Sequence, residues 1–115
     1  LASRMREVPK VEAVVDGEVE AFARRYRELE VEPLVAAMRR QAEEIRVVEL
    51  ERTLRDLRDL DPATAMRIEH LSRALVKKLL HEPTIRLRER AGEGDADEVA
   101  AAVRELFGLI VPRDP

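Results

Sequence analysis

Apolar residues recur at three- and four-residue steps through most of the chain, which is the spacing of one face of a helix. The clearest stripe consists of Ile68, Leu71, Leu75, Leu79, Val76 and Leu80. No stretch alternates apolar and polar residues as a half-buried strand would. The pattern therefore predicts an all-α protein.

Proline marks where we expect the helices to begin and end. Pro33 disfavours helical geometry at the preceding residue and separates a first helix from a second. Asp61 and Pro62 are typical of a helix start, with Asp as the cap and Pro in the first turn. Pro83 is interpreted as a stop and restart, so that one helix ends near His81.

These signals predict a bundle of about five helices, two of them long, joined by short loops. The expected spans are about 10–29, 33–60, 62–81, 83–91 and a last helix that begins at Asp95 and ends at Gly108. Asp95 and Glu98 have the spacing of a capping box. Gly92 and Gly94 predict a flexible joint before that last helix.

Composition limits the possible classes of protein. At 115 residues the chain is one domain or part of one. Charged residues make up 39% with both signs interleaved and a net charge of −3, which argues against an electrostatic nucleic-acid binder. The 45% of hydrophobic residues are periodic, which argues against disorder. Aromatic residues are only 3%, so the core must be aliphatic.

The absence of cysteine excludes disulfides, a thiolate nucleophile and a thiolate metal site in this chain. No apolar run approaches the roughly 18 residues of a membrane span, and no signal-peptide pattern is present. We therefore expect a cytoplasmic protein without a membrane partner. Because the chain begins at Leu1 and not at Met, we also expect it to be a piece of a longer polypeptide.

Candidate chemistry is sparse. His70 shares a helical face with charged residues, and His81 is predicted to complement the dipole at a helix end, so structural roles are favoured for both. The Glu43-Glu44 pair lacks the Glu-x-x-His spacing of a helical di-metal site. A local basic patch could contact RNA or an acidic partner, but a solvated end of the bundle is favoured because stacking aromatics are absent there. It consists of Lys77, Lys78, Arg86, Arg88 and Arg90.

Wide apolar stripes on long helices cannot all be buried inside one small chain, and exposed stripes of that size usually meet a partner. Symmetric self-association is the commonest solution. The pattern favours a homodimer over a compact monomeric bundle that covers every stripe internally.

The run LSRALVKKLLHEPTIRLRE closely resembles the LVNKLLH-x-PT-x-x-L-[RK] motif near the C-terminus of the glutamyl-tRNA reductase family. The likeness continues through an ordered series of family motifs and the closing VRELFGL. The matching residues are Glu18, Phe22, Val31, Pro33, Met38-Arg39, Ala42-Glu43, Ile45, Glu49-Leu50 and Leu54. Lys77 and Tyr26 differ from the residues usual in the family pattern, but these two differences do not weaken the resemblance.

The resemblance implies a division into the end of a long spinal helix, residues 1–29, and a helical dimerisation domain, residues 30–115. It implies that the parent enzyme uses NADPH to reduce glutamyl-tRNA to glutamate-1-semialdehyde for tetrapyrrole synthesis, through an active-site cysteine. Cysteine, cofactor glycines and catalytic residues would all lie N-terminal to this chain. No catalytic, cofactor or metal residue is therefore expected here, and direct tRNA contact is left open.

The alternative from another class is a free-standing helical adaptor that binds a different protein through its stripes. Under the dimer hypothesis, six leucines are expected to form the main apolar core or dimer surface. They are Leu54, Leu57, Leu71, Leu75, Leu79 and Leu80. Leu75→Glu should break the assembly, because it would bury a carboxylate without a partner.

Overall fold

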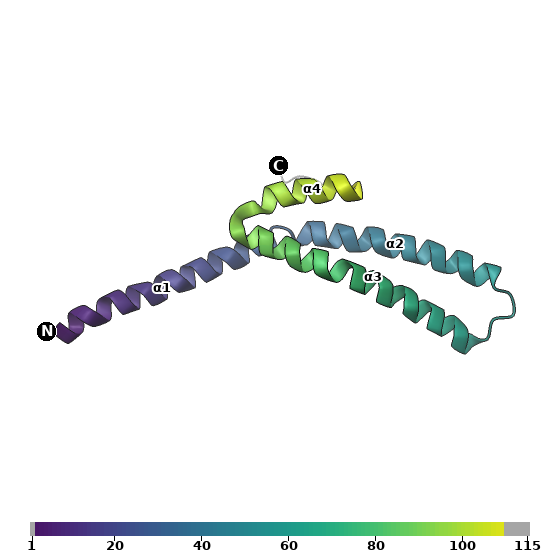
Figure 1. Ribbon diagram of the computed structural model, residues 1–115, viewed down its shortest axis with the longest axis horizontal. Coiled ribbons are helices and arrows are strands. Elements are labelled where there is room, and N and C mark those ends of the chain that lie inside the picture. Colours follow the sequence, from purple (N-terminus) through teal and green to yellow (C-terminus); the bar gives the residue numbers. More distant parts are fainter. Residues whose placement is uncertain (1, 110–115) are drawn as a thin grey trace.

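The computed structural model describes the backbone of residues 2–109 and the side chains of residues 11–109. Within these residues it contains α1 (Ala2–Leu29), α2 (Glu32–Asp56), α3 (Pro62–Arg90), a π-helical turn η1 (Ala91–Asp95) and α4 (Ala96–Phe107). No β-strand occurs in residues 2–109, so the all-α prediction is confirmed there. Figure 1 shows α2 and α3 as a long hairpin, α4 folded back beside it, and α1 as an arm that projects away.

The helix starts predicted from Pro33 and from Asp61 are confirmed for the two helices of the hairpin. Pro33 lies in the first turn of α2, and Asp61 caps α3 by accepting a hydrogen bond from the backbone N–H of Thr64 at 3.2 Å. The end of α2 was predicted too late, because the helix stops at Asp56 and not at Leu60. Asp59 lies in the loop between the hairpin helices with a φ of 66°, a left-handed conformation that Asp tolerates in a turn.

The predicted break at Pro83 is wrong, because α3 runs through it as one helix of 29 residues. A proline inside a helix removes the hydrogen bond to the carbonyl four residues earlier and costs about 3 kcal/mol. Here Pro83 and Leu79 are both exposed, so water can reach the freed carbonyl. Thr84 and Leu87, just beyond the proline, are buried and keep the second half of α3 on the core.

Because two predicted helices merge into α3, the described chain has four α-helices and not five. α1 and α2 are both long, as expected. Asp95 precedes α4 as predicted, but its side chain makes no capping hydrogen bond and instead pairs with Arg90 at 3.2 Å. Gly108 ends α4 in the left-handed conformation, with φ 63°. Residues 110–115 of the expected second domain lie outside the described residues.

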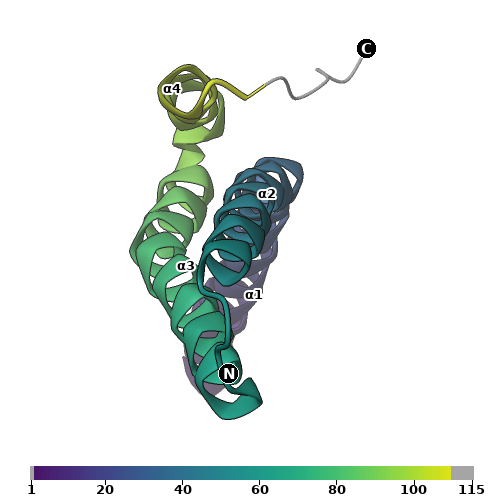
Figure 2. The same cartoon turned by 90° about the vertical axis from the view of Figure 1, so that its right-hand side faces the viewer.

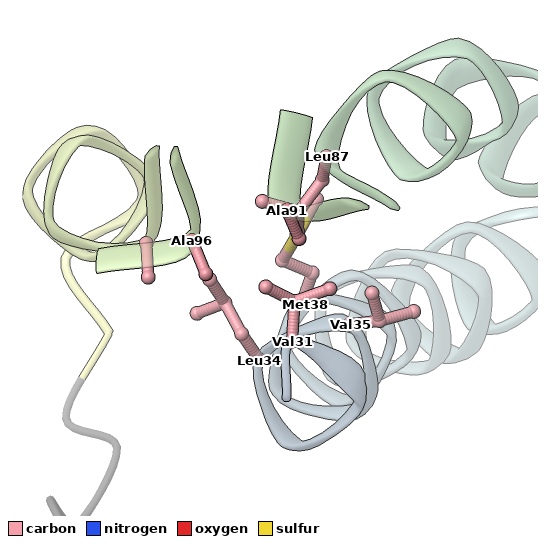
Figure 3. Close-up of a cluster of buried hydrophobic side chains, with 8 residues drawn as sticks. Val31, Leu34, Val35, Met38, Leu87, Ala91 and Ala96 are labelled. Carbon is pink, nitrogen blue, oxygen red and sulfur yellow. The ribbon is translucent and has the colours of Figure 1, made fainter. Parts of the chain in front are cut away.

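The buried core lies near the middle of the long molecule, beside the base of α1, where the start of α2, the end of α3, η1 and α4 meet (Figure 1). Figure 3 shows side chains of α2 pointing toward α3 and toward Ala96. The core consists of Val31, Leu34, Val35, Met38, Leu87, Ala91, Ala96 and Ala100. α2 and α3 continue side by side beyond this core to the loop of the hairpin (Figure 2). We call this core region, which comprises the start of α2, the end of α3, η1 and α4, the head.

The apolar face predicted for the first helix exists but is uncovered. Phe22 and Tyr26 of α1 are 73% and 62% exposed, and the valines before them are also exposed. No helix among the described residues is long and apolar enough to cross a membrane.

Candidate dimer interface

An apolar groove of about 510 Å³ runs along one side of the hairpin, between α2 and α3. Aliphatic side chains of both helices line it, together with Phe107 from α4. Gln41 of α2 positions this end of α4, because its side-chain amide donates a 2.7 Å hydrogen bond to the carbonyl of Phe107. The groove is therefore built by three helices and lies next to the head.

The stripe that the sequence singled out on α3 supplies much of this groove. Leu71, Leu75 and Leu79 line it and are 60%, 53% and 72% exposed. An aliphatic surface this open on one side of a folded chain is the feature expected of a protein-binding face.

The six predicted leucines separate into two groups. Leu71, Leu75, Leu79 and Leu80 all line the groove, and Leu80 also packs against the core. Leu54 is half-buried and Leu57 is 43% exposed, and neither lines the groove. None of the six leucines belongs to the fully buried core. Their role as a dimer surface stays a prediction.

One buried charge lies beside the apolar groove. The side chain of Arg46 on α2 is only 5% exposed, and its Nε donates a 2.9 Å hydrogen bond to Glu43. Its Nη1 donates to the hydroxyl of Ser72 on α3 at 3.3 Å, and that hydroxyl donates to the carbonyl of Glu69 at 2.7 Å. The hydrogen bond with Arg46 lowers the pKa of Glu43. The Arg46–Ser72 hydrogen bond links α2 to α3 in one register, because shifting either helix would break it, whereas Glu43 stays beside Arg46 on α2.

A second face of the hairpin is charged. It carries a second groove, of about 570 Å³, which shares Val76 and Leu80 with the apolar one, so the two grooves adjoin. Its polar lining comes from Arg39, Glu43, Arg73, Lys77, His81, Thr84 and Arg88. Apolar side chains thus dominate the first groove and charged side chains the second, although Arg46 and Glu49 also line the first.

The arginines of the predicted basic patch are paired with carboxylates. Arg86 approaches Glu82 at 3.5 Å, and Arg88 approaches Glu32 at 2.7 Å. Arg90 pairs with Asp95 as described above. This pairing favours a solvated, locally neutralised end of the bundle, as the sequence suggested. The hydrogen bond with Arg88 is also the main reason that the pKa of Glu32 is lowered.

The histidines do not form a site. His70 is exposed, in agreement with the solvated face predicted for it. The prediction that His81 complements a helix end is wrong, since α3 continues nine residues beyond it to Arg90. Among the described side chains, no group of three or more His, Cys, Asp or Glu residues could hold a metal ion.

The six predicted leucines leave out other apolar residues that line the groove, among them Ile45 and Phe107. Ile45 is 61% exposed and lines the groove from α2, and Phe107 reaches it from α4. Both lay on helical stripes of the sequence, but a stripe does not reveal which neighbouring helix it faces. Only the packing of α2, α3 and α4 places these side chains beside Leu75.

Comparison with known proteins points to one family. The family model described as the dimerisation domain of glutamyl-tRNA(Glu) reductase matches residues 10–109. A glutamyl-tRNA reductase of Geobacter metallireducens is 42% identical over 95% of this chain and 25% of its own length. The glutamyl-tRNA reductases of Myxococcus xanthus and Chloroflexus aurantiacus are 43% and 44% identical, over 95% and 84% of this chain and 25% and 22% of their own lengths.

The chain therefore spans about a quarter of the length of the curated relatives that it matches. No solved structure is significantly similar to it.

Proposed function

Because the chain belongs to the glutamyl-tRNA reductase dimerisation-domain family, we propose that two copies associate symmetrically through the apolar groove between α2 and α3. The observation that carries the proposal is the row of Leu71, Leu75 and Leu79, each more than half exposed along that groove. A symmetric pair would bury each leucine twice, once in each copy.

The small size of the core supports association. Eight of the described residues form the core, and three of them, Ala91, Ala96 and Ala100, bury little apolar surface each. Small chains bury a smaller fraction of their surface than large ones and often gain stability from a partner. The outer half of the hairpin, beyond Met38 on α2, has the least internal support and the most to gain from a twin.

The charged groove indicates which side of the hairpin is expected to associate. Burying ionic groups costs free energy unless each has a well-placed partner, so an interface avoids them where an apolar face is available. The groove that contains Arg39, Lys77 and His81 is therefore expected to stay in solvent, and the groove that contains Leu75 to be covered.

We further propose that the protein of which this domain is part reduces glutamyl-tRNA with NADPH in the cytoplasm. The printed names of the relatives support the substrate, and the family resemblance supports the cofactor. The chain has no cysteine, so a catalytic thiol of that reaction would have to lie in another part of the protein. The domain itself would act by holding two catalytic units together. No observation favours the free-standing adaptor over this function.

Sedimentation equilibrium over about a hundredfold dilution tests the proposal, because mass action separates a dimer from a monomer. A concentration-dependent mass that reaches twice the 13.1 kDa of one chain is the expected result. A well-folded monomer at every concentration would contradict it. An assay with glutamyl-tRNA and NADPH on the same sample should show no turnover above buffer.

A further inference from the structure

Among the described residues, α1 contacts the rest of the chain at its C-terminal end. Figure 1 shows it leaving the head as an arm, and the molecule is 84 Å long as a result. The contacts of α1 are mainly with η1, and a few are with α3. A helix of this length transmits any change of angle at its base to its far end, about 40 Å away.

The joint between α1 and α2 is very short. The N–H groups of Glu30 and Val31 bond to the carbonyls of Arg27 and Glu28 at 3.2 and 3.4 Å, so the chain turns within one residue or two. Such a junction can absorb a change of backbone angle, as hinges at element ends commonly do. A contact beyond the joint can therefore help to set the direction of α1.

The contact that does so is made across 65 positions of sequence. Arg27 donates from Nε to the carbonyl of Gly92 in η1 at 2.8 Å, and its Nη2 lies 3.3 Å from Glu20 of its own helix. A charge-assisted hydrogen bond is among the stronger polar contacts in proteins. Gly92 is buried, so its carbonyl has little access to water as a replacement partner.

Gly92 allows this approach because it has no side chain. A Cβ there would lie 3.1 Å from Cγ of Arg24 and 3.1 Å from Oε1 of Glu28, closer than ordinary van der Waals contact. Gly94, two residues later, has a φ of 103°, which turns the chain into α4. Gly92, one of the two glycines that the sequence predicts as a flexible joint, is thus the point where the end of α1 contacts η1.

η1, which carries Gly92, is held firmly against the other elements of the head. Arg88, near the end of α3, binds Glu32 at the start of α2 with two hydrogen bonds, of 2.7 and 3.0 Å. Ala91, at the start of η1, is fully buried in the core. Movement of η1 would therefore disturb the core, whereas movement of α1 is restrained mainly through Arg27 and the packing around Gly92.

We propose that the Arg27–Gly92 contact is a latch that sets the direction in which α1 leaves the head. Arg27 is a positioning residue in this device, and the close approach at Gly92 completes it. The latch does not depend on association. If the dimer proposed above forms, the same contact also sets the angle between its two arms, and that consequence rests on the proposed function.

Distance measurement between two spin labels tests the latch. The chain has no cysteine, so Val15→Cys on α1 and Glu51→Cys on α2 provide two unique labelling sites on exposed positions. Dilution of the labelled chain into excess unlabelled chain restricts the signal to distances within one molecule. The measurement is thus independent of whether the protein is a dimer.

The decisive variant is Arg27→Met, which keeps the long aliphatic stem and the helix propensity but removes the donor. Its matched control is Arg25→Met, at an exposed arginine of the same helix. We expect one narrow distance distribution for the unaltered protein and the control, and a broadened or displaced one for Arg27→Met with unchanged helicity. Gly92→Val, which forces a side chain against Arg24 and Glu28, should displace the distribution as well.

A distribution for Arg27→Met as narrow as the original, at the same distance, would overturn the latch. A broad distribution in the unaltered protein would overturn it too. Neither result would bear on association, which the sedimentation experiment decides separately.

Discussion

Leu75 offers the most direct quantitative test of the apolar groove. It lies on α3 in the row of exposed leucines and is 53% exposed in the single chain. Fully burying a leucine side chain is worth about 1.5–3 kcal/mol, so covering the remaining half is worth about 0.8–1.6 kcal/mol. In a symmetric interface the residue counts twice, which makes about 1.6–3.2 kcal/mol for the pair.

Leu75→Ala should therefore weaken the dimer roughly tenfold to two-hundredfold, since about 1.4 kcal/mol corresponds to each factor of ten in Kd. The fold of one chain should change little, because half of this side chain is already in solvent. The assay is sedimentation equilibrium, with circular dichroism to confirm that helicity is retained. Leu75→Glu is the stronger form of the test and should leave a folded monomer at all accessible concentrations.

The matched control is Val48→Ala on α2. Val48 is 52% exposed, which is close to the value for Leu75, but it does not line the groove. Its Kd should stay within about twofold of the original, since a surface substitution away from the interface rarely changes free energy by more than about 0.5 kcal/mol. An unchanged Kd for Leu75→Ala, or an equal loss for Val48→Ala, would refute the placement of the interface.

Four further substitutions test the core, one ion pair and two glycine positions. Met38 is 1% exposed, so Met38→Ala should lower the free energy of unfolding by about 2–5 kcal/mol in a urea titration at fixed protein concentration, and a loss below about 1 kcal/mol would contradict the core as described. Arg88 lowers the folded-state pKa of Glu32 below its ordinary value of 4.5; this stability is therefore present above pH 4.5 and is lost as the pH falls through the folded pKa. Glu32→Gln should be less stable than the original at pH 7, and the difference should shrink on acidification; a gap that is constant with pH would exclude the ion pair as its source. Gly94→Ala should cost about 1–3 kcal/mol because φ is 103° there, whereas Gly17→Ala, inside α1, should stabilise by about 0.5–1 kcal/mol, and equal effects in thermal unfolding would contradict the assigned backbone.

Prediction from sequence succeeded where the signal is local. The cap at Asp61, the proline in the first turn of α2 and the glycine stop at Gly108 each depend on a few neighbouring residues, and all three lie where expected. The break predicted at Pro83 was wrong because the local cost of a proline inside a helix is offset here by the packing of the residues that follow it. Thr84 and Leu87 provide that packing against the core, and no local pattern indicates it.

The candidate interface shows the same division. The periodicity of α3 correctly identified Leu71, Leu75 and Leu79 as one aliphatic row. It could not tell whether the row is buried within the chain or open, because that depends on where α2 and α4 lie. Arg46 was not singled out for a related reason. A lone arginine on a charged helix looks solvated until Ser72, 26 positions away, is placed beside it.

The sequence by itself thus determined the helical class, most helix ends, the apolar rows and the family resemblance, since each is encoded in residues close together in the chain or in an ordered motif. Tertiary structure alone decided which rows are covered, because burial depends on neighbours distant in sequence. It confined the core to the head and left the row of Leu75 in solvent. It also brought Arg27 to the carbonyl of Gly92, a contact that no spacing rule could have predicted.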